Sequence, residues 1–268
     1  MKMIEKMEHM HFNCLQGMYF SNIIECADYA LVFSDIIEDT YYNYCALLQF
    51  ENDLFMPRWN EIKKKFPANR VTALYVSPSS DLYGSESIYL STFQKNYTDA
   101  WMVLQDRQYF KTDVISQKIS VNKIISKEAF ETFVDVFTAA YSGDDPNDLY
   151  GQLSPTYTKA LLDSWGNNDE YKKMHYLAFL NGKPAGVATA IRHNNLVAVY
   201  NVGTISKYRN NGIGQAIMRN IVNDLKQNET LFLQTEHVSH VEDWYRKMGF
   251  ETLFLGKCYT EKENYKDR

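Results

Sequence analysis

The sequence lacks long apolar runs and has no excess of basic residues. Apolar stretches such as residues 30–33 and 231–233 are far shorter than the ~20 residues that cross a bilayer, so we expect no membrane-spanning helix. Lysine and arginine number 28 against 33 acidic residues, a net charge of -5, which argues against a nucleic-acid partner. The first residues also lack an apolar core followed by small residues, so we expect no signal peptide and a cytoplasmic protein.

Cysteine motifs are absent, and glycine is scarce in the first half of the chain. The four cysteines, Cys14, Cys26, Cys45 and Cys258, form no C-x-x-C pair, which favours reduced, buried thiols over a disulfide framework or a zinc site. Two of the 12 glycines precede residue 118, and the other ten follow it. The two halves of the chain therefore differ in glycine content. From the cysteine pattern we expect no bound metal.

The length and composition fit a globular protein with one large domain or two ordinary ones. The chain has 268 residues, of which 45% are hydrophobic and 23% charged. A polar stretch at residues 111–117 separates the apolar run 101–104 from a new strand-like segment at 119–125. We therefore predict two domains, residues 1–117 and 118–268. The sequence leaves the oligomeric state open, a homo-oligomer included.

The first half has an α/β pattern without a motif that indicates chemistry. We predict strands at residues 28–34, 41–50, 70–77 and 100–105. Helices are predicted after an Asp53 cap and over residues 86–95.

The second half alternates more clearly between helical and strand periodicity. Apolar residues at helical spacing predict helices over 127–141 and 155–165. The dipeptide Asn181-Gly182 predicts a hairpin turn between strands at 176–180 and 184–192, and a third strand follows at 196–205.

A glycine-bearing loop at residues 208–215 then leads directly into a helix predicted over 214–227. Ile213, Ile217, Ile221 and Leu225 recur every four residues, as on the buried face of an amphipathic helix. The unpaired N–H groups and positive dipole at its start, without bulky side chains, suit an anion of pyrophosphate size. A dinucleotide fingerprint fails because Ile217 replaces its third glycine, and the P-loop pattern fails as well. A glycine turn without a ligand is the alternative.

A second motif follows this loop and helix in the sequence. A strand is predicted over 230–236, and Ser239 with Glu242 forms a capping-box pattern at the start of another helix. That helix carries Trp244 and Tyr245 and stops at Gly249, which Phe250 follows.

These two motifs together resemble the signatures of the GNAT N-acetyltransferase superfamily over roughly residues 118–260. The R-x-x-G-x-G loop at 209–214 is similar to the family's acyl-CoA loop, and Tyr245 stands four residues before a Gly-Phe pair. The resemblance implies an α/β (α+β) fold with a mixed, splayed β-sheet flanked by helices. It also implies acetyl-CoA as co-substrate, with the pantetheine lying in the gap between the strands that end near Thr204 and begin at Thr230.

The resemblance assigns cofactor-binding roles by position. Val202, Gly203 and Thr204 would bond the pantetheine, and Gly203 fits a bulge or a close backbone approach. Val238 departs from the family pattern, because many relatives carry asparagine there. The pyrophosphate would be held by Arg209, Asn210, Asn211, Gly212, Ile213, Gly214 and Gln215.

The reaction implied is direct attack of a primary amine on the thioester of acetyl-CoA in a ternary complex. Tyr245 is expected to protonate the departing thiolate, with a packed core tyrosine as the alternative. Glu236 is expected to act as the base, directly or through water, although a carboxylate at a strand end is often merely solvated. His237 and His240 lie nearby in sequence and are alternative bases. A non-catalytic acyl-CoA sensor or scaffold is the alternative function.

Two further interpretations concern the acceptor and the first half. Asp144, Asp145 and Asp148 favour a cationic acceptor amine, unless they form a solvated loop. Residues 1–117 resemble a degenerate, smaller GNAT-like α/β domain without a cofactor loop, or else form an unrelated α/β cap.

Overall fold

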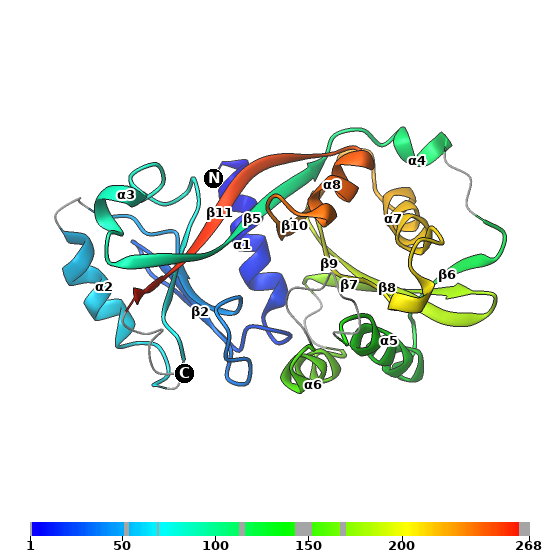
Figure 1. The fold of residues 1–268 in the computed structure, drawn as a ribbon, viewed down its shortest axis with the longest axis horizontal. Coiled ribbons are helices and arrows are strands. Elements are labelled where there is room, and N and C mark those ends of the chain that lie inside the picture. The colour runs from blue at the N-terminus through cyan, green and yellow to red at the C-terminus, as the bar shows by residue number, and fades with distance from the viewer. Residues whose placement is uncertain are drawn as a thin grey trace. The chain divides into compact units, whose positions relative to one another are not determined.

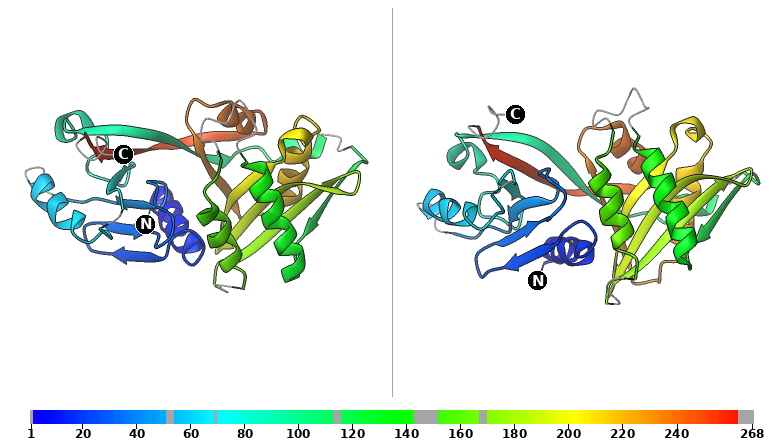
Figure 2. Two further views of the ribbon diagram at one scale, coloured as in Figure 1. Left: turned by 60° about the horizontal axis from the view of Figure 1, so that its bottom comes forward. Right: turned by 90° about the horizontal axis from the view of Figure 1, so that it is seen from below.

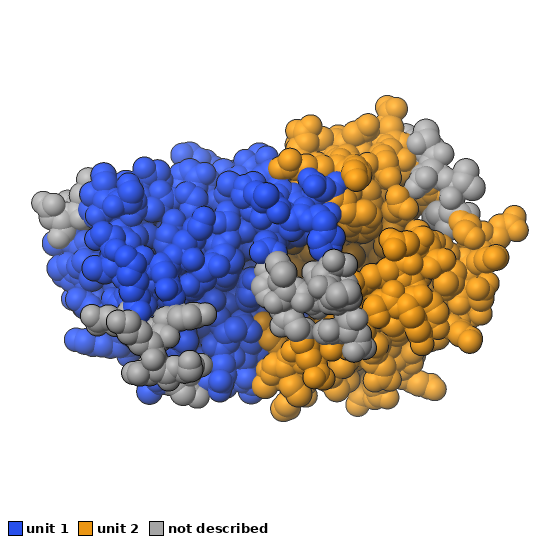
Figure 3. All heavy atoms as spheres, in the orientation of Figure 1, with its two compact units in different colours: residues 1–101, 235–243, 252–268 blue, residues 102–234, 244–251 orange. Residues whose placement is uncertain are grey.

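The computed structural model describes residues 2–50, 54–68, 70–112, 116–142, 152–166 and 170–262. These residues form a mixed α/β protein with two compact units, which Figure 3 colours separately. Unit 1 comprises Met1–Trp101, Thr235–Asp243 and Thr252–Arg268, and unit 2 comprises Met102–Gln234 and Trp244–Glu251. The predicted α/β class is confirmed.

Unit 1 contains a mixed sheet whose strands are labelled in Figure 1. Its elements are α1 (Met3–Leu15), β1 (Asn22–Glu25), β2 (Ala30–Phe33), β3 (Asn43–Ala46), α2 (Phe55–Lys63), β4 (Ala73–Val76), α3 (Glu86–Tyr89), most of β5 (Phe93–Leu104) and most of β11 (Phe250–Glu261). The strand order is β1-β2-β3-β4-β11-β5. β1, β2 and β3 pair antiparallel, β4 runs parallel to β3, and β11 runs antiparallel to β4.

Unit 1 differs from the sequence prediction in its helices. Helix α1 was missed because its buried face includes Glu8 and His11 beside apolar residues, which breaks the apolar pattern. The helix predicted over 86–95 ends at Tyr89, because Phe93 starts the long strand β5. Asp53 lies outside the described residues, and Leu54 holds the cap position before α2.

Unit 2 contains the sheet that the second half predicts. Its elements are α4 (Tyr109–Thr112), β6 (Ile119–Lys123), α5 (Lys127–Ala140), α6 (Pro155–Asp163), β7 (Lys172–Leu180), β8 (Lys183–His193), β9 (Leu196–Thr204), a 3-10 turn (Ser206–Tyr208), α7 (Ile213–Asn223), and parts of β10 (Thr230–Glu236) and α8 (His240–Lys247). The strand order is β10-β9-β8-β7-β6, antiparallel from β6 to β9, with β10 parallel to β9.

Local sequence explains how these elements begin and turn. Asn181 and Gly182 both adopt left-handed conformations, with φ of 50° and 76°, so the predicted Asn-Gly hairpin is confirmed. Ser126 caps α5, because its hydroxyl accepts from the N–H of Ala129 at 3.2 Å. Ser154 caps α6, and Pro155 holds the first helical position.

The helices of unit 2 cover both faces of its sheet. Figure 2 shows α5 and α6 against one face, and α7 lies on the other (Figure 1). Two glycines permit close contact on opposite faces. A Cβ at Gly186 would lie 2.6 Å from Cγ2 of Ile213 in α7, and a Cβ at Gly203 would lie 2.9 Å from Cβ of Ala140 in α5. Glycine at these positions therefore sets how near each helix can come.

The compact units do not coincide with the two predicted domains. Unit 2 begins at Met102 rather than at residue 118, and residues 235–243 and 252–268 belong to unit 1. A linear reading of the chain cannot show this exchange, because β5, β10 and β11 each contribute residues to both units. Among the described residues, no helix is long and apolar enough to span a membrane.

We predict that Gly186→Ala lowers the free energy of unfolding by about 1–3 kcal/mol, the usual cost of overpacking a close contact. The added methyl group would meet Ile213 on α7. Urea denaturation measures the change. Repeating the substitution in an Ile213→Ala background should remove most of the loss, because the opposing side chain is then gone. An equal loss in both backgrounds would contradict this account of the packing.

Candidate active site

The strand β9 and the first turn of α7 carry most of the residues that the resemblance assigns to the cofactor. Residues 209–212 connect the 3-10 turn Ser206–Tyr208 to α7, and Asn210 and Gly212 adopt left-handed conformations with φ of 62° and 81°. The side-chain amide of Asn211 donates to the carbonyls of Tyr208 and Arg209, both at 3.0 Å. The side chain of Asn211 thus holds the loop that leads into the helix.

The first turn of α7 leaves backbone donors without helical partners. The first intrahelical bond runs from the N–H of Ala216 to the carbonyl of Gly212 at 3.0 Å. The N–H groups of Ile213, Gly214 and Gln215 precede it, so helix geometry gives them no acceptor inside α7. Gly212 is the N-cap, and within the described chain no side chain caps this helix end. The positive end of the dipole and three converging donors can bind an anion here.

The side chains of this turn are directed by packing within unit 2. Ile213 is buried against Gly186, and Gln215 donates to the hydroxyl of Tyr109 at 3.2 Å. A Cβ at Gly214 would lie 2.9 Å from Cζ2 of Trp244, so the indole lies directly on this glycine. Trp244 can therefore pack this closely on the turn only because position 214 has no side chain.

The described pairing of β9 with β10 stops at Val199, before β9 reaches this turn. The ladder between β9 and β10 covers Leu196–Val199 and Thr230–Leu233, and no described pair continues it toward Thr204. The sheet therefore separates at this point, as the resemblance predicts. On its other edge β9 pairs with β8 as far as the pair Gly186 and Thr204.

The predicted irregularity in β9 is present, but it begins before Gly203. Val187 pairs with Gly203 whereas Thr189 pairs with Tyr200, so two residues of β9 oppose Ala188 alone. Asn201 lies in this bulge with φ of 56°. Gly203 serves the close approach to α5, as its contact with Ala140 shows.

The C-terminal end of α5 binds the same segment of β9. The hydroxyl of Tyr141 donates to the carbonyl of Val202 at 2.8 Å. The Arg209 guanidinium donates to the carbonyls of Thr204 at 3.1 Å and Ala140 at 3.3 Å. Arg209 therefore links β9 to α5, and its role toward pyrophosphate stays a prediction. Tyr141 was missed, because a tyrosine at a helix end gives no signal in the sequence.

Tyr245 is a buried side chain of α8 with 5% of its surface exposed. Its ring packs edge-on against Trp244 and Phe250, with centroids 4.8 Å and 5.5 Å away. Burial, followed by the neighbouring Tyr141, raises the pKa of Tyr245 well above its usual range. The phenol therefore keeps its proton at neutral pH, as a general acid must.

Glu236 ends β10 and belongs to unit 1, whereas Tyr245 belongs to unit 2. Its side chain is half-buried, and its backbone carbonyl accepts from the hydroxyl of Ser239 at 2.6 Å. His237 is bound to the buried carboxylate of Glu242 at 3.0 Å, while His240 is exposed. Among the three candidate bases, His237 is already bound to a carboxylate and His240 is exposed, whereas Glu236 is half-buried.

The bond from the N–H of Glu242 to the Ser239 side chain, one part of the predicted capping box of α8, is present. The N–H of Glu242 donates to the hydroxyl of Ser239 at 3.1 Å, but the Glu242 carboxylate accepts from the N–H of Val238 at 2.7 Å. It also accepts from the hydroxyl of Thr252 at 2.8 Å. A carboxylate at a helix N-terminus is favoured in either arrangement.

The remaining predictions concern the cysteines, three aspartates and a metal site. None of the four cysteines forms a disulfide, and Cys26 alone among them is exposed. Asp144, Asp145 and Asp148 lie outside the described residues. Across the described parts of the chain, no group of three or more His, Cys, Asp or Glu side chains could hold a metal ion.

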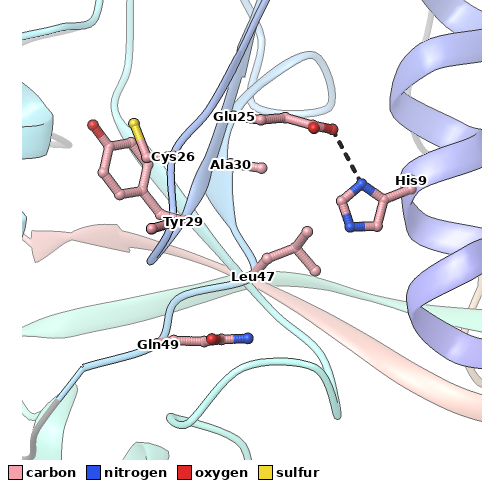
Figure 4. Close-up of a pocket in the computed structure, with 8 residues that line it drawn as sticks. His9, Glu25, Cys26, Tyr29, Ala30, Leu47 and Gln49 are labelled. Carbon is pink, nitrogen blue, oxygen red and sulfur yellow. Dashed lines mark hydrogen bonds and ion pairs between the residues drawn. The ribbon is translucent and has the colours of Figure 1, made fainter. Parts of the chain in front are cut away.

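A separate hollow of about 130 Å³ lies in unit 1 (Figure 4). On one side His9 forms an ion pair with Glu25 at 3.1 Å, and on another the thiol of Cys26 lies next to the ring of Tyr29. The described lining contains none of the site residues predicted from the sequence: His9, Glu25, Cys26, Ala27, Tyr29, Ala30, Leu47 and Gln49.

Several solved structures have a fold similar to that of this chain. A GCN5-related N-acetyltransferase from Kribbella flavida matches with a TM-score of 0.70 and 11% identity, over 98% of this chain and 96% of that one. A GCN5-related N-acetyltransferase from Sphaerobacter thermophilus matches with a TM-score of 0.58 and 13% identity, over 87% and 79%. A tandem GNAT protein from the clavulanic acid biosynthesis pathway matches with a TM-score of 0.59 and 10% identity, over 87% and 77%.

No curated protein matches the sequence. The family model of the acetyltransferase (GNAT) family matches residues 133–250, which include β9, the loop before α7 and Tyr245. The resemblance seen in the two motifs and the separated sheet of unit 2 agree with this match. Residues 133–250 are therefore identified as a domain of the GNAT acetyltransferase family.

Proposed function

We propose that the protein is an N-acetyltransferase that moves the acetyl group of acetyl-CoA to a primary amine by direct attack in a ternary complex. The observation that carries the proposal is the first turn of α7, whose N–H groups have no acceptor inside the helix, together with the end of β9 beyond its described pairing with β10, both within unit 2. One supplies converging N–H donors and the other supplies a strand edge. An acyl-CoA has both a pyrophosphate and an extended pantetheine arm with amides.

The residues of this region fit the co-substrate. The N–H groups of Ile213, Gly214 and Gln215 would hold the pyrophosphate, because α7 gives them no acceptor and no described side chain caps its start. Backbone groups of Val202, Gly203 and Thr204 would bond the pantetheine as an added strand does. Acetyl-CoA, when bound, supplies the activated acyl carbon and a thiolate leaving group.

Tyr245 would protonate the departing thiolate. Its burial keeps the hydroxyl protonated, and a phenol can pass its proton to a thiolate in a coupled, hydrogen-bonded step. Glu236 would accept the proton of the attacking amine, directly or through water. Tyr245 and Glu236 belong to different compact units. The role of acid and the role of base therefore each need a separate variant.

A non-catalytic acyl-CoA sensor is the second candidate function. The observation that favours it is the tight packing of Tyr245 between Trp244 and Phe250. A sensor would bind acetyl-CoA through the same turn and strand edge but would transfer no acetyl group to any amine. For the enzyme, Asp144, Asp145 and Asp148 favour a cationic acceptor on charge alone.

The similarity to a tandem GNAT protein also supports a proposal for the first half of the chain. We propose that residues 1–117 derive from a second, degenerate GNAT-like copy that binds no CoA. The helix α2 has Pro57 in its first turn, which removes one N–H donor from that end.

Gly214→Asp should abolish the rise in melting temperature that acetyl-CoA produces, because the carboxylate would occupy and repel the phosphate site. Since the new side chain also meets Trp244, circular dichroism must show an intact fold. Gln215→Glu tests the charge alone without added bulk and should weaken binding about tenfold. Gln227→Asp adds the same charge beyond the other end of α7 and should leave binding unchanged. Undiminished stabilisation in both site variants would refute the assignment of this turn.

Tyr245→Phe should retain acetyl-CoA binding and lower turnover about 10²-fold or more, the scale of a lost general acid. A panel of primary amines with a thiol-release assay measures the rate. Tyr176→Phe is the matched control, since it also removes a buried hydroxyl of unit 2, which donates to Asp224 at 2.6 Å. It should cost stability and not turnover. Equal turnover in the wild type and Tyr245→Phe, with chemistry limiting, would exclude Tyr245 as the acid.

A further inference from the structure

A buried hydroxyl group of β8 bonds the bulge in β9. Thr189 is fully buried, and its hydroxyl accepts from the side-chain amide of Asn201 at 3.3 Å. Asn201 is one of the two residues of β9 that oppose Ala188 alone, and its φ of 56° is left-handed. Asparagine tolerates this conformation better than most residues. The side chain of Asn201 therefore ties the bulge to the neighbouring strand.

The hydroxyl of Thr189 is fixed from another side by His175 of β7. The two residues pair across β7 and β8, and Nδ1 of His175 lies 2.9 Å from the Thr189 hydroxyl. The imidazole packs against the rings of Phe130 and Phe133, with centroids 4.7 Å and 5.1 Å away. Burial lowers the pKa of His175 to about 3, so the ring is neutral under ordinary conditions. A neutral Nδ1 can accept from the hydroxyl while that hydroxyl accepts from Asn201.

The bulge decides which residues of β9 face α5. Before the bulge, Tyr200 pairs with Thr189. A regular ladder would then place Val202 opposite Val187, but the extra residue places Gly203 there. The missing side chain of Gly203 lets α5 approach the strand closely at this position. Loss of the bulge would turn Val202 toward α5 and change the directions of the backbone groups that follow.

We propose that Thr189 is a positioning residue for acetyl-CoA, because its hydroxyl holds the bulge that sets the register of residues 202–204. The backbone groups of these residues are the ones proposed to bond the pantetheine as an added strand does. The N–H groups proposed to hold the pyrophosphate begin at Ile213, outside the bulge. Loss of the Thr189 hydroxyl should therefore weaken the contacts of the pantetheine and spare those of the pyrophosphate. The proposal rests on the proposed function only in giving residues 202–204 this role.

Calorimetric titration with two probes tests this difference. Thr189→Val keeps the branched shape and removes the hydroxyl, and it should raise the Kd of acetyl-CoA about tenfold, the scale of a lost hydrogen bond. The Kd of 3′-phospho-ADP, which has the pyrophosphate of CoA without the pantetheine, should change by less than about twofold. Thr189→Ser retains the hydroxyl and should bind acetyl-CoA as the wild type does. Undiminished binding of acetyl-CoA to Thr189→Val, or an equal loss for both probes, would overturn the proposal.

A double-mutant cycle separates the bond to Asn201 from the other contacts of Thr189. Asn201→Gly keeps a positive φ accessible and removes the amide that donates to Thr189. In this background Thr189→Val should weaken acetyl-CoA binding much less than in the wild type, because the partner is already gone. Equal effects in the two backgrounds would contradict the assigned role.

Thr138→Val is the control for a lost threonine hydroxyl in unit 2. The hydroxyl of Thr138 donates to the carbonyl of Val134 at 2.9 Å within α5, away from the bulge. The substitution should leave the Kd of acetyl-CoA unchanged. A loss as large as that in Thr189→Val would show that the effect is not specific to the bulge and would overturn the proposal.

Amide hydrogen exchange reads the bulge without any ligand. In Thr189→Val the amides of residues 201–203 should exchange about tenfold faster than in the wild type, whereas those of residues 196–199 before the bulge should keep their rates. Unchanged exchange at residues 201–203 would overturn the proposal, whatever the affinity for acetyl-CoA. If the wild type binds no acetyl-CoA, the proposed function fails instead, and the exchange rates still decide whether Thr189 holds the bulge.

Discussion

Close packing around the first turn of α7 is the constraint on which the candidate site depends. The indole of Trp244 lies against Gly214 on one side, and Gly186 lets Ile213 approach the sheet on another. Any side chain at Gly214 or Gly186 would move α7 and its N–H groups. The same indole contacts Tyr245, so Trp244 joins the first turn of α7 to the proposed acid.

The end of α5 contributes a second set of contacts to the candidate site. Tyr141 bonds Val202 in the bulged part of β9, and Arg209 bonds both Thr204 and Ala140. These bonds hold the segment of β9 that follows its described pairs with β10. They also place Tyr141 where it influences the ionisation of Tyr245. Strand, loop and acid are thus connected within unit 2.

The sequence predicts the second half well because its signals are local. Asn181-Gly182 fixes a hairpin by its own conformation, and the glycine loop before α7 is a continuous motif. Unit 1 is harder to predict, since its buried polar groups depend on distant partners. Helix α1 buries Glu8 and His11, which conceal its periodicity. The hydroxyl of Tyr75 donates to Asp99 at 3.0 Å and lies where a Cβ at Gly256 would be, and these three residues are 24 or more positions apart in the sequence.

The central claim is that the N–H groups at the start of α7 bind the pyrophosphate of acetyl-CoA. Titration of the ¹⁵N-labelled protein with acetyl-CoA, followed by amide NMR, tests this claim most directly. The account predicts that the amide signals of Ile213, Gly214 and Gln215 shift strongly downfield and saturate at one equivalent per chain, as donors to an anion do. Saturable binding of acetyl-CoA that leaves these three signals in place and shifts others would contradict it.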